Sequence, residues 1–249
     1  IYVVKGEEKN IKITYQEDIF LADKLFQLKS ITMSEDISLS DLKDKVIVVF
    51  GASRGIGKSI TDIAETYGAK VYGFSRKNSV DVSSFTKVSD SLEEVYGKEH
   101  IIHYIVNTAG IMRMGKLELR ETDHIMEEIY TNYIGAINIV RAGIKYLRES
   151  RGSLALFTSS SYTRGRALYS VYSSVKAAIV NLSQAMAEEL LIDHVKINVI
   201  NPERTATPMR LENFGKEPED TLLKPEKVAI VSLQTLLSDL TGQVIDVRK

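Results

Sequence analysis

The chain has 249 residues, of which 44% are hydrophobic and 26% charged, a composition typical of a folded globular protein rather than a disordered one. Its formal net charge of −1 excludes a strong overall attraction to nucleic acid or to an anionic membrane. The lack of cysteine excludes disulfides and thiolate metal sites, and no apolar run reaches the roughly 18 residues of a membrane span. We therefore expect a soluble, cytoplasmic protein that binds neither nucleic acid nor a membrane.

The N-terminal segment differs from the rest of the chain. Residues 11–28 have the pattern of a short strand followed by an amphipathic helix, and a polar stretch typical of a linker comes next. The apolar stripe of the helix consists of Ile19, Leu21, Leu25 and Leu28. Because the chain starts at Ile1 rather than at methionine, we expect a processed product or an excised piece. The predicted organisation is a tail at 1–30, a linker at 31–41 and a main domain at 42–249.

From residue 46 onward, short apolar runs alternate with longer helical patterns. The apolar runs lie at 46–50, 70–74, 101–106, 153–157, 196–200 and 243–247, and the helical patterns near 55–67, 84–97, 118–149, 169–193 and 225–239. Continuous apolar strands that alternate with helices are typical of a parallel sheet covered on both faces. The sequence therefore predicts an α/β fold with a doubly wound parallel sheet.

The stretch GASRGIGKS (51–59) fits two phosphate-binding motifs. Counted from Ala52 it is close to the loop of nucleotide triphosphatases, and counted from Gly51 it is related to the dinucleotide-binding turn. A triphosphatase also needs a strand that ends in aspartate to hold magnesium. The strand at 101–106 instead runs into Asn107, which favours the dinucleotide interpretation.

Four residues further along suggest carbonyl chemistry. Tyr172 and Lys176 are four residues apart on a predicted helix, so their side chains are neighbours. A phenol with a pKa near 10 is a poor acid–base catalyst at pH 7, and a nearby ammonium group is expected to lower that pKa. Ser159 can hydrogen-bond a carbonyl oxygen that the tyrosine protonates. Asn132 can hold a relay water with its side-chain amide.

Together these motifs identify residues 42–249 as resembling the short-chain dehydrogenase/reductase family. They are GASRGIG, NTAG (107–110), Asn132, Ser159, YSSVK (172–176) and INPERTATPM (200–209). The resemblance implies a Rossmann-type fold, a nicotinamide cofactor and hydride transfer to or from a carbonyl carbon, with Asn132, Ser159, Tyr172 and Lys176 as catalytic residues. The cofactor-binding residues it implies are Gly51, Ser53, Arg54, Gly55, Ile56, Gly57, Ser75, Arg76, Asp81, Val82, Asn107, Ala109, Gly110, Tyr172, Lys176, Pro202, Thr205 and Thr207.

The chain departs from the family pattern at two places. Only a few residues separate the second strand from Asp81 and Val82, the usual adenine-contacting pair, which leaves no room for a crossover helix. Glu203 stands after Pro202, where the family usually has glycine.

The cofactor choice is predicted from charge. An NAD site has a carboxylate at the end of the second strand, whereas an NADP site has a cation for the 2′-phosphate. Here that strand is followed by Ser75, Arg76 and Lys77, and the glycine turn contributes Arg54. These residues favour NADP(H).

The segments that wall the substrate pocket in the resembled family carry several arginines. They are Arg113, Arg164, Arg166, Arg204 and Arg210. Because guanidinium groups bind phosphate in a bidentate manner, we expect an anionic, phosphorylated substrate. The four histidines show no metal-ligand spacing, so no metal is expected.

Residues 10–26 resemble the C-terminal end of sugar-phosphate cytidylyltransferases. A reductase joined to such a domain resembles the bifunctional ribulose-5-phosphate reductase/CDP-ribitol pyrophosphorylase family. That resemblance implies an NADPH-dependent reduction of D-ribulose 5-phosphate to D-ribitol 5-phosphate, which the nucleotidyltransferase domain activates for capsule or cell-wall polymer synthesis. Two alternatives stay open, namely reduction of another carbonyl substrate such as a 3-oxoacyl thioester, and a non-catalytic NADP-sensing module.

A homodimer is the expected assembly. In the resembled family, the helices that correspond to 118–149 and 169–193 pair across a twofold axis, which makes one apolar patch self-complementary. The apolar residues expected at this interface are Ile125, Ile129, Ile137, Val140, Ala177, Ile179, Val180, Leu182 and Ala185.

Overall fold

The computed structural model describes residues 11–27, 30–33 and 37–249. The chain divides into two compact units, Ile1–Ser30 and Ile31–Lys249. In the first unit the expected helix is α1 (Gln16–Gln27). The strand expected before it is wrong, since residues 11–14 have no regular structure.

The start of α1 explains the missing strand. The carboxylate of Asp18 accepts hydrogen bonds from the backbone N–H groups of Thr14 and Tyr15, both at 2.8 Å, which turns the chain into the helix. These two bonds also hold the pKa of Asp18 below its ordinary value. Ile19 and Leu21 of the expected stripe are more than half exposed. Leu25 and Leu28 lie outside the described side chains.

The second unit contains the predicted parallel sheet. Its strand order is β1-β7-β6-β5-β4-β2-β3, and the six longer strands pair in parallel. The strands are β1 (Ser30–Ile31), β2 (Val46–Phe50), β3 (Lys70–Phe74), β4 (Tyr104–Asn107), β5 (Ser153–Phe157), β6 (Lys196–Pro202) and β7 (Val244–Val247). All six predicted strands are confirmed, although β4 begins later than expected and β6 runs through Pro202.

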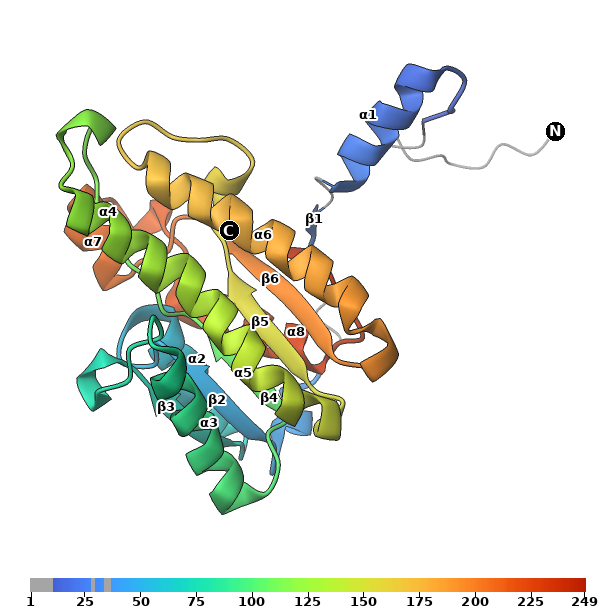
Figure 1. The fold of residues 1–249 in the computed structure, drawn as a ribbon, viewed down its shortest axis with the longest axis vertical. Coiled ribbons are helices and arrows are strands. Elements are labelled where there is room, and N and C mark those ends of the chain that lie inside the picture. Colours follow the sequence, from blue (N-terminus) through green and yellow to red (C-terminus); the bar gives the residue numbers. More distant parts are fainter. Residues whose placement is uncertain (1–10, 28–29, 34–36) are drawn as a thin grey trace. The chain divides into compact units, whose positions relative to one another are not determined.

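Apolar side chains fill one layer on each face of this sheet. One face is covered by α3 (Phe85–Glu99), α5 (Gly135–Ser150) and α6 (Ser170–Glu189), and the other by α2 (Gly55–Thr66) and α8 (Pro225–Leu237) (Figure 1). Every residue of β2 and β5 is buried, which explains their unbroken apolar sequences. Parallel strands bring their carboxyl ends to one edge, so the segments after β2 to β6 gather there.

The helix predicted at 118–149 is confirmed from Thr122 to Ser150, but it starts later than expected and is interrupted by a π turn. The region contains a 3-10 turn (Leu117–Leu119), α4 (Thr122–Ile129), one π-helical turn (Tyr130–Ile134) and then α5. A π turn inserts an extra residue into a helix and turns the side chains after it to a new direction. One inserted residue is only a small phase shift in a long apolar pattern, so the sequence pattern does not reveal the turn.

The crossover from β3 to α3 is as short as the sequence predicts. It contains only a 3-10 turn (Arg76–Asn78), so the missing helix is confirmed and β3 forms one edge of the sheet. Further 3-10 turns lie at Leu39–Leu42, Ser160–Tyr162, Leu191–Asp193 and Glu219–Thr221.

A helix that the sequence pattern did not predict, α7 (Pro208–Phe214), forms between β6 and α8. The hydroxyl of Thr207 accepts a hydrogen bond from the backbone N–H of Arg210 at 3.3 Å, and Pro208 occupies the first helical position. Both are standard helix-start signals. Gly215, with a φ of 73°, ends the helix.

The apolar residues expected at a dimer interface divide into two groups. Val140, Ile179 and Val180 are buried in the core of this chain. Most of the other members are only partly buried, namely Ile125, Ile129, Ile137, Ala177 and Leu182, and Ala185 is exposed. Part of the expected stripe is therefore ordinary core.

Among the described residues, no helix combines the length and the apolar character that a membrane span requires.

The turn after β2 depends on Gly57, and this can be tested by mutation. A Cβ added to Gly57 would lie 2.3 Å from the Oγ1 of Thr108 and 2.4 Å from the carbonyl oxygen of Gly51. We expect Gly57→Ala to lower the free energy of unfolding by about 1–3 kcal/mol, as overpacking does. Gly97, an exposed helical residue with nothing within 4 Å of an added Cβ, is the control. Gly97→Ala should stabilise by about 0.5–1 kcal/mol in the same urea titrations. Equal effects of the two substitutions would contradict this packing.

Candidate active site

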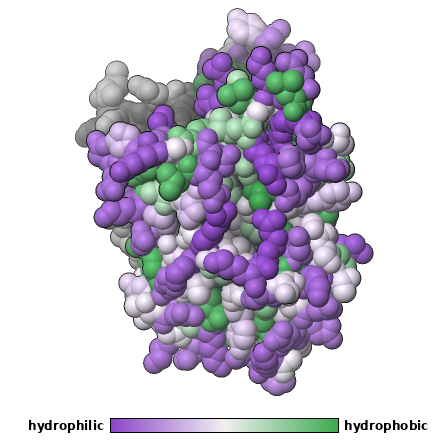
Figure 2. Space-filling view, turned by 90° about the vertical axis from the view of Figure 1, so that its left-hand side faces the viewer, coloured by the Kyte–Doolittle hydropathy of each residue, from purple (hydrophilic) through white to green (hydrophobic). Residues whose placement is uncertain are grey.

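A cleft of about 540 Å³ lies at the carboxyl ends of the strands. Its wall is formed by the glycine turn after β2, by the segments after β3 to β6, and by α6 and α7. In Figure 2 the side of the molecule that lies on the left of Figure 1, with α4 and α7, is mostly hydrophilic, with hydrophobic residues between the polar ones. Of the residues predicted to bind the cofactor, all except Asn107 line the cleft. Asn107 is buried, and its Oδ1 accepts a hydrogen bond from the N–H of Ala109 at 3.1 Å.

The glycine turn has the shape that a phosphate group requires. Gly51 and Gly55 have φ values of 86° and 59°, in the region that favours glycine. A Cβ on Gly51 would lie 2.5 Å from the backbone nitrogen of Ala109, so this residue must be glycine for the turn to pack. Arg54, the N-cap of α2, makes no side-chain cap, so the first N–H groups of the helix remain available to an anion. These residues fit the pyrophosphate of a dinucleotide.

Lys58 argues further against a triphosphatase. In that class the corresponding lysine reaches the phosphates. Here the Nζ of Lys58 donates to the carboxylate of Asp62 at 2.8 and 2.9 Å on the exposed side of α2, and the residue does not line the cleft.

The segment after β3 brings cations to one side of the cleft. Ser75, Arg76 and Lys77 all line the cleft, as does Arg54 from the neighbouring turn. The hydroxyl of Ser75 accepts a hydrogen bond from the backbone N–H of Lys77 at 3.2 Å, which fixes the turn. The carboxylate of Asp81 accepts two hydrogen bonds from Ser83, at 2.9 Å from its N–H and 2.7 Å from its hydroxyl.

The predicted Ser–Tyr–Lys group gathers where α6 meets the end of β5. The Nζ of Lys176 donates to the carbonyl of Phe157 at 2.9 Å and lies 5.4 Å from the centre of the Tyr172 ring. Ser159 follows β5 and caps a 3-10 turn, and its hydroxyl accepts a hydrogen bond from the hydroxyl of Ser161 at 3.2 Å. Ser159, Tyr172 and Lys176 all line the cleft.

Burial controls the protonation of this group. It lowers the pKa of the Lys176 ammonium to about 8. It also raises the pKa of the Tyr172 hydroxyl, and the negative charge of the Glu128 carboxylate raises that pKa further. The pKa of Tyr172 is therefore raised and not lowered as expected, because burial penalises the phenolate. The ammonium group of Lys176 is itself desolvated and directs a hydrogen bond to Phe157. Tyr172 keeps its proton at neutral pH.

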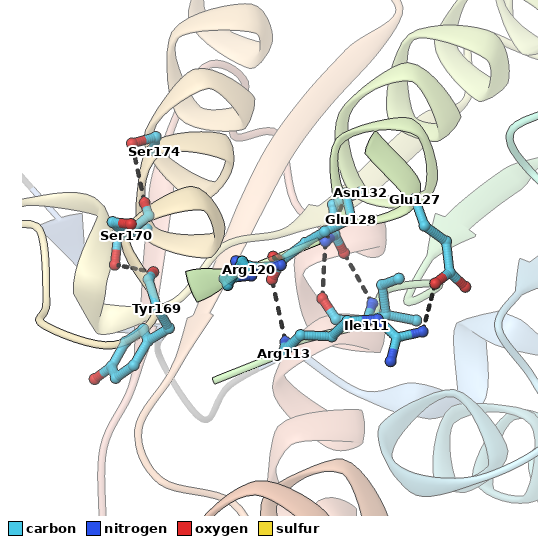
Figure 3. A network of polar contacts seen from close by, with 10 residues as sticks. Ile111, Arg113, Arg120, Glu127, Glu128, Asn132, Tyr169, Ser170 and Ser174 are labelled. Carbon is cyan, nitrogen blue, oxygen red and sulfur yellow. Dashed lines mark hydrogen bonds and ion pairs between the residues drawn. The ribbon is translucent and has the colours of Figure 1, made fainter. Parts of the chain in front are cut away.

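Asn132 lies in the π turn rather than in the cleft wall. Its two amide N–H groups donate to the carbonyls of Ile111 (2.8 Å) and Glu128 (2.9 Å), and its Oδ1 accepts from the N–H of Ile111 at 3.0 Å (Figure 3). No side-chain donor is left for the expected relay water. The amide instead fixes the backbone just after Gly110, where an added Cβ would lie 2.8 Å from the Asn132 Oδ1 and 3.9 Å from the Lys176 Nζ.

Two of the five arginines predicted for the substrate line the cleft, namely Arg204 and Arg210. The Nε and Nη2 of Arg210 donate to the carboxylate of Glu217 at 2.6 and 2.8 Å. The Nη1 of Arg204 lies 3.9 Å from the same carboxylate, and most of this side chain is exposed.

The other three arginines lie outside the cleft. Arg113 pairs with Glu127 of α4 (Figure 3). Arg164 and Arg166 are exposed on the segment between β5 and α6. Within the described part of the chain, no three side chains of the metal-ligating types form a metal site.

Comparison with known proteins agrees with this geometry. The family model described as short chain dehydrogenase matches residues 77–218, which is more than half of the chain. The chain belongs to the short-chain dehydrogenase family. Its members are oxidoreductases, and their fold binds a nicotinamide cofactor.

Individual relatives give further detail. The chain is 49% identical to the bifunctional ribulose 5-phosphate reductase/CDP-ribitol pyrophosphorylase of Haemophilus influenzae, over 98% of this chain and 52% of that relative. It thus spans about half of the length of that protein. A 3-ketoacyl-(acyl-carrier-protein) reductase of Brucella melitensis, solved with NADH, shares the fold with a TM-score of 0.76 and 21% identity, over 83% of this chain and 97% of that one. The ligand-free aldohexose dehydrogenase of Thermoplasma acidophilum has a TM-score of 0.75 and 25% identity, over 84% and 94% of the two chains.

The structure places Glu203, the residue that departs from the family's usual glycine, at the cleft wall. Its carboxylate accepts hydrogen bonds from the guanidinium of Arg248 at 3.3 Å and from the backbone N–H of Lys249 at 3.1 Å. The carboxylate of Glu203 is therefore held in place by the two residues that follow β7.

The structure also reveals site residues that the sequence analysis missed. The ring of Tyr169 stands edge-on to those of Tyr172 and Phe214, with centroids 6.4 and 6.0 Å apart. Tyr169 is the N-cap residue of α6, three residues before Tyr172. The buried carboxylate of Glu128 pairs with Arg120 at 2.6 Å, and no spacing in the sequence indicates this contact.

The shifted pKa of Lys176 makes a prediction about stability. Between its folded pKa of about 8 and its ordinary value of 10.5, the unfolded chain binds more protons than the folded chain. The cost of burying the charge is therefore complete below pH 8 and is relieved as the pH rises towards 10.5. We expect the stability of the wild type relative to Lys176→Met to increase over this interval, by up to about 3 kcal/mol.

Chemical denaturation of both proteins at pH 7.5 and pH 10 measures this difference. Lys58→Met, at an exposed lysine, is the control and should show little change with pH. A difference between wild type and Lys176→Met that is constant or decreases with pH would contradict the buried state of this amine.

Proposed function

We propose that this chain reduces a phosphorylated keto-sugar with NADPH, and specifically that it converts D-ribulose 5-phosphate to D-ribitol 5-phosphate. The observation that carries the proposal is a single cleft with two kinds of group. Ser159, Tyr172 and Lys176 lie over β5, and the cations Arg54 and Arg76 lie over β2 and β3. One end is suited to protonating a carbonyl oxygen, and the other to binding a phosphate.

NADP(H) is the proposed cofactor. Ser75, Arg76, Lys77 and Arg54 line the side of the cleft where β3 ends, and guanidinium groups match the 2′-phosphate in charge and geometry. The only carboxylate that follows directly in this segment, Asp81, is hydrogen-bonded to Ser83. The glycine turn and the N-terminus of α2 are proposed to hold the pyrophosphate.

The proposed roles of the protein residues follow from the site. A reduced nicotinamide, when bound, supplies the hydride that the carbonyl carbon receives. The Ser159 hydroxyl donates a hydrogen bond to the carbonyl oxygen, and Tyr172 transfers its phenolic proton to that oxygen, which gives an alcohol. Tyr172 carries this proton at neutral pH, as a proton donor must, although burial makes the phenol a weaker acid. Lys176 holds α6 to Phe157 and offers its charge to the phenolate that remains.

Arg204 and Arg210 are the residues that we propose for the substrate phosphate. Arg210 uses Nε and Nη2 on Glu217, so mainly its Nη1 remains for a ligand. Arg204 makes a looser pair with Glu217 and is the better placed of the two to turn towards an anion. A carbonyl compound with a phosphate group fits this cleft wall better than an uncharged acyl chain does.

The relative from Haemophilus influenzae supports the choice of sugar, since its name gives a ribulose 5-phosphate reductase joined to a CDP-ribitol pyrophosphorylase. We propose that this chain likewise works beside a cytidylyltransferase domain in the full protein. D-Ribitol 5-phosphate made in the cytoplasm would then be converted to CDP-ribitol for capsule synthesis.

A direct assay tests the proposal. NADPH absorbance is followed with D-ribulose 5-phosphate, with the unphosphorylated sugar and with a 3-oxoacyl thioester. We expect turnover mainly with the sugar phosphate, and a much higher rate with NADPH than with NADH. Turnover of the thioester alone would favour the acyl reductase alternative, and NADPH binding without turnover of any carbonyl would favour a sensing module.

Tyr172→Phe tests the proton donor in the same assay. Loss of a general acid lowers rates by roughly 10²–10⁴, and NADPH affinity should change little. Tyr162→Phe, at a tyrosine that does not line the cleft, is the control. A Tyr172→Phe protein with nearly full activity would remove Tyr172 from the mechanism.

We also propose that the chain forms a homodimer through α4, α5 and α6. The partly exposed residues Ile129, Ile137 and Leu182 lie on these helices, which also carry Tyr172 and Lys176. Light scattering should give a mass of twice 27.9 kDa. A monomer that still reduces the substrate would overturn the proposed assembly.

A further inference from the structure

The helix α7 crosses the cleft from the cofactor side to the substrate side. At its start, the Cβ of Thr207 and the Cδ of Pro208 lie 3.5 and 3.8 Å from the position of a Cβ on Gly55, so it packs over the glycine turn. At its end, the ring of Phe214 meets the ring of Tyr169 at 6.0 Å. A shift of α7 would therefore change the contacts with the glycine turn on one side of the cleft and with Tyr169 on the other.

One ion pair holds α7 to the glycine turn. Both carboxylate oxygens of Glu212 accept hydrogen bonds from the guanidinium of Arg54, one from Nη1 and one from Nη2, the latter at 3.2 Å. The two side chains are about half exposed, at 49% for Arg54 and 53% for Glu212. In this arrangement the carboxylate presents two acceptor oxygens to the guanidinium edge, just as a phosphate group does.

We propose that Glu212 is a specificity-determining residue, because its carboxylate holds the guanidinium edge of Arg54 that the 2′-phosphate of NADP(H) requires. The inference rests on the proposed cofactor. Binding of NADP(H) exchanges the carboxylate for the phosphate and releases α7 from the glycine turn. NAD(H) has no such phosphate and binds with the ion pair intact. Glu212 therefore weakens NADP(H) binding and leaves NAD(H) binding unchanged.

The second cation at this side of the cleft behaves differently. Arg76 lies 3.3 Å from Glu127, but Glu127 also pairs with Arg113. The hydrogen bond from Arg113 lowers the pKa of Glu127 more than the one from Arg76 does. If Arg76 turns to a phosphate, the carboxylate of Glu127 therefore still has Arg113 as its partner. The helix that carries Glu127, α4, then stays in place. The exchange that frees a whole segment is the one at Glu212.

The release of α7 connects cofactor choice to the substrate side. Arg210 and Phe214 lie on the same short helix as Glu212, and both line the cleft. When the ion pair between Arg54 and Glu212 breaks, the side chains of Arg210 and Phe214 can move to adjust to a substrate. NADP(H) therefore prepares the substrate side in a way that NAD(H) does not.

Binding titrations of NADP⁺ and NAD⁺ to the full chain test this inference without any turnover. Glu212→Gln removes the charge and keeps the size. Because an exposed ion pair contributes up to about 1 kcal/mol, we expect its loss to lower the Kd for NADP⁺ about two- to fivefold. The Kd for NAD⁺ should stay the same. Asp62→Asn is the matched control, since Asp62 is 54% exposed and forms an ion pair with Lys58 on α2 outside the cleft. It should change neither Kd.

A double mutant separates the ion pair from a general effect of charge. Arg54→Ala should raise the Kd for NADP⁺ about tenfold or more. In that background Glu212→Gln should have no further effect on NADP⁺. Glu212→Ala repeats the measurement through a second substitution, and melting temperatures confirm that each variant is folded.

Three results would overturn the inference: no change in the Kd for NADP⁺ on Glu212→Gln, an equal change for both cofactors, or a change that persists with Arg54→Ala. If Arg54→Ala weakens NADP⁺ alone and Glu212→Gln is silent, only the role of Glu212 fails. If Arg54→Ala affects neither cofactor and the wild type binds both equally, the proposed NADP(H) preference fails as well.

Discussion

Two hydrogen bonds tie α6 to the end of β5, and the chemistry of the cleft depends on them. The Nζ of Lys176 donates to the carbonyl of Phe157 at 2.9 Å, and the hydroxyl of Thr158 donates to the carbonyl of Lys176 at 2.7 Å. They bury the amine and set Tyr172, one helical turn earlier, above the strand end that carries Ser159. The same lysine anchors the helix and supplies the charge of the site. Position and protonation are therefore coupled at this residue.

The arginines that face the cleft are already paired with glutamates. Arg54 holds Glu212, Arg76 holds Glu127, and Arg210 holds Glu217. An anionic ligand that binds one of these arginines therefore replaces the glutamate with which that arginine is paired. Of these glutamates, Glu212 lies within α7 and Glu217 lies three residues after its end, so the exchange of partners is tied to the position of that segment.

Much of the fold follows from the sequence, because buried parallel strands appear as unbroken apolar runs and because Tyr172 and Lys176 lie one turn apart. The short crossover before Asp81 is also evident from its length. Three features were not predictable. The π turn at Asn132 shifts the apolar pattern by only one residue, so the sequence still has the pattern of one helix. The pairing of Arg54 with Glu212 joins residues 158 positions apart. The raised pKa of Tyr172 depends on burial that only the packed structure provides.

Isotope labelling tests most directly whether hydride passes from NADPH to the carbonyl carbon of D-ribulose 5-phosphate. The chain is incubated with D-ribulose 5-phosphate and NADPH in which both hydrogens on the reactive carbon of the nicotinamide are replaced by deuterium, and the pentitol phosphate is analysed by mass spectrometry and NMR. We expect one deuterium, bound to the carbon of the former carbonyl group, in D-ribitol 5-phosphate. Pentitol phosphate without deuterium, or no pentitol phosphate at all, would contradict this expectation.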